Sequence, residues 1–270
     1  MKNLIGHCAM VTGGAGGIGL SFAKELARLG CGLLLVDISA ERLEAARMEI
    51  CDASDKIDIS KIKLLTLDLT DAEFLAILDK YCTSQCINPD ILINNAGIFS
   101  FLPVKDHSEK KIEMFIDLHV RAVALLSRWF VTRRLPHGSG WLLNMSSMSC
   151  WMPMPGIALY SSTKAFIRAF TRALHYEVKD DGVKVMVACP GGIATDLFGL
   201  PSNLKKLAVA IRVLDTPERF AAKAINKMLR GKKQYINGWL NRFSIFFIAV
   251  TPTWVRMLVK RKMLDKGIVR

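Results

Sequence analysis

The segment TGGAGGIG, residues 12–19, follows a short apolar run and opens an amphipathic stretch, which predicts a strand, a turn and a helix in succession. Glycines at this spacing let the backbone turn tightly and approach a pyrophosphate, which then rests on the N-terminus of the helix. The candidate contacts are Thr12, Gly13, Gly17, Ile18 and Gly19. A glycine-rich turn without a ligand is the simpler alternative, because the spacing differs from the plain dinucleotide fingerprint.

Short apolar runs alternate with amphipathic stretches on the C-terminal side of this segment. The expected strands are His7–Thr12, Gly32–Asp37, Lys63–Asp68, Asp90–Asn94, Trp141–Met145 and Lys184–Cys189. The expected helices are Ile18–Leu29, Glu41–Ala53, Asp71–Thr83, Lys110–Arg134 and Tyr160–Asp180. Strand alternating with helix predicts an α/β fold in which a parallel sheet is covered on both faces. Ligands of such sheets bind at the carboxyl ends of the strands.

The pattern changes after Cys189. A helix is expected over Thr216–Arg230, with Thr216 as its N-cap, and a short strand over Gln234–Asn237. From Thr253 onward, apolar and basic residues alternate at helical spacing. We therefore expect a single cofactor-binding and catalytic domain over residues 1–240, followed by an apolar, basic and helical extension over residues 241–270.

The positive charge is concentrated near the C-terminus. Residues 1–200 contain 21 Lys and Arg against 21 Asp and Glu, whereas residues 201–270 contain 16 against 3. Such a concentration predicts an anionic contact, and the apolar run Phe243–Val250 beside it favours an anionic membrane surface over residues 241–270. The run is too short to span a bilayer. An acidic protein partner, a substrate lid and a dimer contact remain alternatives, whereas no nucleic-acid recognition motif is present.

Seven scattered cysteines indicate reduced thiols and a cytoplasmic protein, which the basic extension would bring to a membrane as a peripheral protein. The N-terminus lacks the apolar stretch and cleavage site of a signal peptide. Cys82 and Cys86 share a helix face, but further metal ligands are missing nearby, so we expect no metal site.

Two aspartates follow expected strands. Asp37 ends the second strand, where a carboxylate can bind a ribose 2′-hydroxyl and repel a 2′-phosphate, which favours NAD over NADP. A solvated turn aspartate is the alternative at this position. Asp68 ends the third strand and is either an N-cap of the next helix or an adenine contact.

Ser147, Tyr160 and Lys164 form the strongest catalytic pattern. Tyr160 and Lys164 are four residues apart at the start of an expected helix and share one face. An ammonium beside a phenol is expected to lower the phenol pKa from about 10 towards neutrality, which gives a usable general base. Ser147 follows the fifth strand and can donate a hydrogen bond to a substrate oxygen. These features together predict an enzyme that moves a proton as well as a hydride.

The combination of motifs resembles the short-chain dehydrogenase/reductase family over about residues 5–195. The motifs are Thr12-Gly13…Gly17-Ile18-Gly19, Asn94-Asn95-Ala96-Gly97, Ser147 with Tyr160-x3-Lys164, and Pro190-Gly191. The resemblance implies a Rossmann-type doubly wound parallel sheet of about seven strands.

The resemblance also implies residue roles. Tyr160 would be the acid/base, Ser147 would orient the carbonyl, and Lys164 would lower the tyrosine pKa and bind the nicotinamide ribose. The implied cofactor contacts are Asp68 at adenine, Asn95, Ala96 and Gly97 along the cofactor, and Pro190, Gly191, Ile193 and Thr195, the last at the carboxamide.

His119 departs from the family pattern, which usually has an asparagine that holds a water of the proton relay at this place. A buried histidine that only satisfies the helix is one interpretation. A relay group that titrates near neutral pH is the other.

Apolar residues surround the expected substrate position. They are Met148–Pro155 before Tyr160, and Leu197, Phe198, Leu200, Leu204 and Leu207 after Gly191. If they line a pocket rather than pack in the core, the substrate is lipophilic: steroid-like, retinoid-like or long-chain. The sequence thus predicts an NAD-linked oxidoreductase of a lipophilic secondary alcohol or ketone, and we expect a homo-oligomer. The alternatives are a 3-oxoacyl-type reductase of a carrier-linked acyl chain and a non-catalytic dinucleotide sensor.

Overall fold

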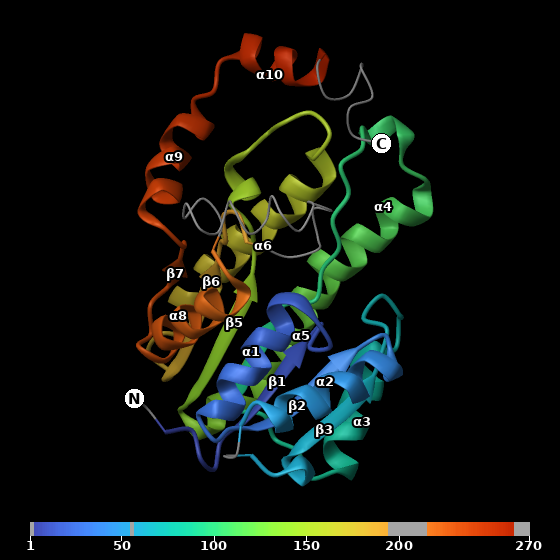
Figure 1. Cartoon of the computed structure of the whole chain (residues 1–270), viewed down its shortest axis with the longest axis vertical. Helices are drawn as coiled ribbons and strands as arrows, with labels where there is room; N and C mark the ends of the chain where they lie inside the picture. The colour runs from blue at the N-terminus through green and yellow to red at the C-terminus, as the bar shows by residue number, and fades with distance from the viewer. Residues whose placement is uncertain (1–2, 55–56, 194–214, 262–270) are drawn as a thin grey trace.

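A seven-stranded parallel sheet forms the centre of the protein, as its computed structural model shows for residues 3–54, 57–193 and 215–261. The strand order is β3-β2-β1-β4-β5-β6-β7. The strands are β1 (Cys8–Thr12), β2 (Gly32–Asp37), β3 (Ile62–Thr66), β4 (Ile91–Asn94), β5 (Gly140–Met145), β6 (Val183–Ala188) and β7 (Gln234–Tyr235). Every neighbouring pair is parallel, and helices lie on both sides of the sheet (Figure 1). The predicted Rossmann-type α/β fold is therefore confirmed.

The strands alternate their side chains between two hydrophobic cores. In β1, Ala9 and Val11 belong to one core, whereas Met10 belongs to the other. Because successive residues of a strand point to opposite faces, near-continuous apolar strands are what a sheet covered on both sides requires. One core packs against α1 (Gly17–Arg28), α2 (Ala40–Asp52) and α8 (Pro217–Leu229), and the other against α3 (Phe74–Ser84), α5 (Ala122–Arg134) and α6 (Ala158–Glu177).

Most of the expected elements are present, with two differences of detail in the helices. Thr216 caps α8 as predicted, because its side chain accepts a hydrogen bond from the Arg219 backbone N–H. The helix expected from Asp71 begins only at Phe74. The helix expected over Lys110–Arg134 is divided into α4 (Glu109–Ile116) and α5 by a π-helical turn, η3 (Asp117–Arg121).

The chain ends in two further helices, α9 (Trp239–Ala249) and α10 (Thr253–Val259). They follow β7 at the edge of the sheet and lie at the periphery of the molecule (Figure 1). The helical character expected of the extension is present, and α9 begins two residues before the expected boundary at residue 241.

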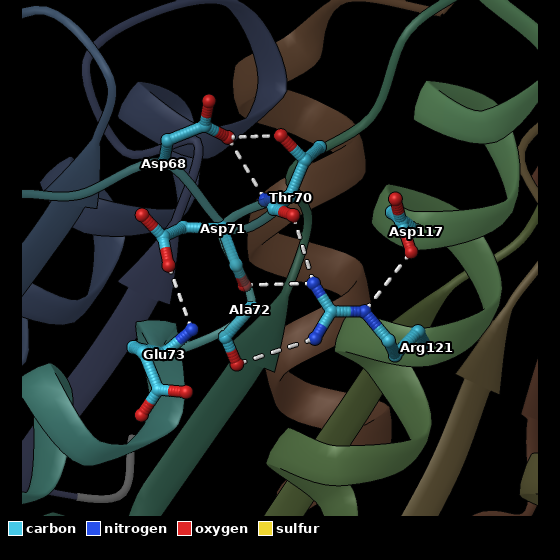
Figure 2. A network of polar contacts seen from close by, with 7 residues as sticks. All are labelled: Asp68, Thr70, Asp71, Ala72, Glu73, Asp117 and Arg121. Atoms are coloured by element: carbon cyan, nitrogen blue, oxygen red, sulfur yellow. Dashed lines mark hydrogen bonds and ion pairs between the residues drawn. The ribbon is translucent and has the colours of Figure 1, made fainter. Parts of the chain in front are cut away.

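Arg121, in the π-helical turn, binds the loop that follows β3 (Figure 2). Its Nη2 donates hydrogen bonds to the carbonyl oxygens of Thr70 at 2.8 Å and Asp71 at 2.7 Å, and its Nη1 reaches Ala72 O at 3.5 Å. Its Nε donates to Asp117 Oδ1 at 3.0 Å, which fixes the guanidinium on its own helix. One planar cation therefore holds three successive carbonyls of the loop, a geometry that lysine cannot reproduce.

Replacing Arg121 with alanine is expected to lower the free energy of unfolding by about 1–2 kcal/mol, because the charged hydrogen bonds are lost at a partly exposed site. Arg121→Lys should restore little of this loss. Chemical denaturation measures the change, with Arg128→Ala, at an exposed arginine of α5, as the matched control. Equal stability of the Arg121 and Arg128 variants would show that the loop does not depend on this contact.

Candidate active site

A cavity of about 570 Å³ lies at the carboxyl ends of the central strands. It forms where strand order reverses, because β1 pairs with β2 on one side and with β4 on the other. Such a switch point is where doubly wound sheets bind their ligands. Within the described residues, all the expected cofactor contacts line the cavity except Thr12 and Gly19, which lie beneath the turn. Thr195 and the apolar residues from Leu197 to Leu207 fall outside the described residues.

The glycine turn is shaped by close approach to β4. Gly13 has φ +62°, and a Cβ there would lie 3.0 Å from Ala96 Cα. A Cβ at Gly19 would lie 2.0 Å from Gly13 O. Side chains are therefore excluded at both positions, and α1 begins at Gly17 with its N-terminus at the cavity. Backbone N–H groups at such a terminus suit an anionic pyrophosphate.

Thr12 and Asn95 connect this turn to the end of β4. Thr12 Oγ1 accepts hydrogen bonds from the backbone N–H groups of Asn95 at 3.0 Å and Ala96 at 3.1 Å. Asn95 Nδ2 donates in return to Thr12 O at 3.1 Å and Gly13 O at 3.2 Å. These residues brace the cradle from below, which explains the position of Thr12 outside the cavity lining.

Asp37 and Arg42 face the same end of the cavity with opposite charges. Asp37 Oδ2 accepts a hydrogen bond from the Ala15 backbone N–H at 3.2 Å, so its carboxylate lies against the glycine turn. Arg42 extends over the turn from α2, because a Cβ on Gly16 would lie 2.3 Å from Arg42 Nη2. Nothing in the spacing of Arg42 distinguishes it from an ordinary helix arginine, so the sequence alone does not indicate this position.

Asp68 lies in the loop beyond β3 and lines the cavity. Its Oδ1 accepts hydrogen bonds from the Thr70 backbone N–H at 2.8 Å and from Thr70 Oγ1 at 2.7 Å (Figure 2). The N-cap interpretation is wrong, because α3 begins at Phe74 and Glu73 occupies the cap position. Asp68 instead shapes the loop that Arg121 holds.

Tyr160, Lys164 and Ser147 meet where β5 ends. Tyr160 and Lys164 lie in the first turns of α6, and both are buried. Lys164 Nζ donates a hydrogen bond to Met145 O at 3.1 Å and lies 5.7 Å from the centroid of the Tyr160 ring. Ser147 lies two residues beyond Met145, the last residue of β5. Its Oγ accepts a hydrogen bond from the Ser149 N–H at 3.1 Å, so its hydroxyl hydrogen can be donated to another group.

Burial has the largest effect on the pKa values of both Tyr160 and Lys164. It raises the pKa of Tyr160 to about 12, although a hydrogen bond from Ser147 acts in the opposite direction. It lowers the pKa of Lys164 to about 8. The expected lowering of the phenol pKa is therefore not found in the free protein, because desolvation by burial outweighs the hydrogen bond from Ser147. At neutral pH the Tyr160 phenol is protonated, and Lys164 is largely in its ammonium form.

His119 lies in the π-helical turn beside Tyr160 and is fully buried. Its Nε2 accepts a hydrogen bond from the Ile98 backbone N–H at 3.0 Å, so Nδ1 carries the proton and donates to Thr163 Oγ1 at 3.0 Å. Thr163 in turn donates to Tyr160 O at 3.0 Å. Burial and then the charge of Lys164 hold the pKa of His119 well below its usual value. The imidazole is therefore neutral, with both nitrogens engaged.

The apolar wall of the cavity differs from the one expected. Within the described residues it is formed by Ile98, Met114, Leu118 and Met145 rather than by the Met148–Pro155 loop. Met148 is buried, and Trp151 stacks against Arg168, whose guanidinium carbon lies 4.4 Å from the ring centroid. Phe99, which no motif in the sequence indicates, packs edge-on against Tyr160 at 5.0 Å between ring centroids.

The loop after β6 completes the cavity with Pro190, Gly191 and Ile193. Asn237, beyond β7, accepts a hydrogen bond from the Gly191 N–H at 2.7 Å through its Oδ1. The loop after β6 is thus held in place by a residue that follows the last strand of the sheet. Sequence spacing could not have identified Asn237, because its partner lies 46 residues away.

Comparisons with known proteins agree with this geometry. The family model for short chain dehydrogenase matches residues 7–202. The very-long-chain 3-oxoacyl-CoA reductase of Bos taurus is 30% identical, over 96% of this chain and 84% of the relative. The inactive hydroxysteroid dehydrogenase-like protein 1 of Homo sapiens is 28% identical, over 93% of this chain and 74% of the relative.

A solved structure with a similar fold is the short-chain dehydrogenase from Sphingobium yanoikuyae in complex with NADPH, with a TM-score of 0.75 and 24% identity. The alignment covers 98% of this chain and 97% of that chain. The match of the family model to most of the chain, together with the fold and the cavity, shows that the protein belongs to the short-chain dehydrogenase family and is an oxidoreductase.

Proposed function

We propose that the protein transfers a hydride between NAD and a lipophilic ketone or secondary alcohol, with Tyr160 as the proton donor and acceptor. The observation that carries this proposal is the meeting of Ser147, Tyr160 and Lys164 beside a cavity whose glycine turn fits a pyrophosphate. The set is intact, which argues against the non-catalytic sensor, although one relative is named inactive.

The chain's own groups supply the proton transfer and the orientation. In the reductive direction, Tyr160 donates its phenolic proton to the carbonyl oxygen, and Ser147 donates a hydrogen bond to the same oxygen. The ammonium of Lys164 then stabilises the phenolate that remains. The nicotinamide, when bound, supplies the hydride to the carbonyl carbon, and in the oxidative direction it accepts the hydride while the phenolate accepts the proton.

The cavity residues would hold the cofactor along its length. The N-terminus of α1 and the glycine turn would bind the pyrophosphate, Asp68 the adenine end, and Lys164 the nicotinamide ribose. Asn95, Ala96 and Gly97 would line its middle, and Pro190, Gly191, Ile193 and Thr195 the nicotinamide end. Asp37 supports NAD, because its carboxylate would bind a ribose hydroxyl and repel a 2′-phosphate. Arg42 would lend NADP some affinity through its charge.

A long-chain 3-oxoacyl thioester is the substrate class that we favour over a steroid-like or retinoid-like alcohol. The similar proteins include several named very-long-chain 3-oxoacyl-CoA reductases. The cavity wall of Ile98, Met114 and Leu118 suits an apolar chain. A phenol that is protonated at neutral pH also favours the reductive direction, since reduction needs an acid at that position.

We propose that His119 positions the site rather than relays protons. The hydrogen-bond chain from Nδ1 ends at the backbone carbonyl of Tyr160, which cannot pass a proton on. The Nε2 contact instead holds the backbone that follows Gly97, and a Cβ on that glycine would lie 2.9 Å from Nε2. We further propose that the protein is a cytoplasmic homo-oligomer.

Replacing Tyr160 with phenylalanine is expected to lower the rate of ketone reduction at least about 100-fold, because the acid at the reacting oxygen is lost. Cofactor affinity, measured by fluorescence titration with NADH, should stay within about two-fold, since the removed hydroxyl acts on the substrate. Tyr176→Phe, at an exposed tyrosine of α6, is the control. A Tyr160→Phe enzyme with near-native turnover would refute the assignment.

Replacing Asp37 with alanine is expected to reduce the preference for NAD over NADP by about 10- to 100-fold, which corresponds to one charged hydrogen bond. Arg42→Ala should change the preference in the opposite direction by weakening NADP. The ratio of kcat/KM for the two cofactors measures both effects. A native enzyme that prefers NADP would overturn the assignment of Asp37.

The pH profile separates the two interpretations of His119. The reductive rate of the native enzyme should be flat at neutral pH and fall as pH rises through about 8, because Lys164 then loses its proton. The oxidative rate should rise with pH as phenolate becomes available. His119→Asn should keep both profiles and lower the melting temperature. A pH dependence of the native rate near neutrality that disappears in this variant would instead support a relay role.

A further inference from the structure

Exposed aromatic side chains gather on α9 and α10, the two helices that lie at the periphery of the molecule (Figure 1). Trp239 is 74% exposed, Phe246 69% and Trp254 69%. Across residues 3–54, 57–193 and 215–261, every exposed tryptophan and phenylalanine lies in these two helices. We call the exposed apolar set the aromatic face: Trp239, Phe243, Phe246, Phe247, Val250, Trp254, Met257 and Leu258. Eight exposed large apolar side chains gathered on two consecutive helices indicate a binding surface.

The face follows the helical repeat. In α9 and at its C-cap, Val250, the members are separated by four, three, one and three residues, which places them on one side of the helix. The opposite side carries Ile245 and Ile248, which are half-buried. In α10 the members are three and one residues apart and again share one side. Helix α9 therefore buries one apolar side partly and exposes the other, and α10 exposes the side that carries Trp254, Met257 and Leu258.

The charges beside the face are positive. No Asp or Glu occurs between Glu218 and Asp265. Arg242, Lys260 and Arg261 are exposed next to the aromatic side chains. Exposed aromatic residues together with basic residues characterise helices that lie in the interface of an anionic bilayer, where tryptophan is preferred. Two copies of this face would bring like charges together, and an acidic protein would not require so many exposed rings.

Helix α9 is attached directly to the active site. Asn241 Nδ2 donates a hydrogen bond to Asn237 O at 2.8 Å, and Asn237 binds the Gly191 N–H. A Cβ on Gly191 would lie 2.2 Å from Asn241 Nδ2. The helix also packs against η5 (Met148–Trp151) beside Ser147. A surface bound to the aromatic face would therefore lie close to the loops that surround the reacting groups.

We propose that the aromatic face docks the protein onto the surface of an anionic phospholipid bilayer, with α9 and α10 lying in the plane of the interface. Within the described residues, none of the helices is long and apolar enough to cross a membrane. Delivery of a long-chain substrate from that surface would rest on the proposed function, whereas docking onto the bilayer is independent of it.

Vesicle sedimentation of the full chain tests the docking. The protein should bind vesicles of phosphatidylcholine mixed with phosphatidylglycerol and bind pure phosphatidylcholine only weakly. Added salt should release it, because screening weakens the attraction of the basic residues. Tryptophan fluorescence should shift to shorter wavelength on binding, since Trp239 and Trp254 are exposed in the free protein.

Paired variants separate the apolar and charged contributions. Lys260→Glu combined with Arg261→Glu should lower the partition coefficient about 30-fold or more, since two basic residues are lost. Phe243→Ser combined with Phe246→Ser should cause a loss at least as large. The matched controls, at residues that are also exposed, are Lys80→Glu with Lys110→Glu, and Met48→Ser with Ile77→Ser. Neither control should change binding.

Three outcomes would overturn the proposal. They are equal binding to neutral and anionic vesicles, binding to neither, and a dimer that dissociates in the Phe243→Ser, Phe246→Ser variant while vesicle binding is absent. Turnover of a short water-soluble ketone is measured alongside and should be unchanged in every face variant. If the native protein turned over neither this ketone nor a long-chain 3-oxoacyl thioester, the proposed function would be refuted and the docking result would stand.

Discussion

The two hydrogen bonds that Thr12 accepts from the backbone of Asn95 and Ala96 hold the rest of the site in place. They join β1 to β4, which are neighbours in the sheet although β2 and β3 separate them in the chain. With these strand ends held together, Gly13 has no room for a side chain, and the turn into α1 has one available path. The shape of the glycine turn, and of the end of the cavity that it lines, thus follows from the contact between the ends of two strands.

A second connection places the reacting groups. Ser146 Oγ donates a hydrogen bond to Lys164 O at 2.7 Å, and Lys164 Nζ donates to Met145 O. The end of β5 and the start of α6 are therefore tied by two hydrogen bonds, each from a side chain of one segment to a backbone carbonyl of the other. This pair fixes Tyr160 relative to the sheet in the free protein, so the site is organised before a ligand arrives. The cost is burial of a cation, which the lowered pKa of Lys164 reflects.

The sequence predicts the elements that local periodicity determines, and it misses those that distant contacts determine. Strand–helix alternation, the glycine turn and the Tyr160–Lys164 pair depend on neighbours in the chain, and the structure contains all of them. The start of α3 at Phe74, the π-helical turn and the position of Arg42 depend on segments that are far apart. The sequence also predicts the wrong direction for the shift in the Tyr160 pKa, because spacing reveals a nearby charge but not the extent of burial.

The π-helical turn also affects how the length of the chain can vary. The Ala122 N–H bonds to Asp117 O, five residues back, so the turn holds one residue more than an α-helical bond would enclose. Removing that residue would let an ordinary α-helical turn close in its place, so α5 would keep nearly the same orientation about its axis. Leu126 and Phe130, which belong to the core, would stay against the sheet. The segment between Phe115 and Leu126 can therefore lose one residue at this turn without repacking the core, whereas a deletion inside the regular part of α5 would rotate the residues beyond it by about 100°.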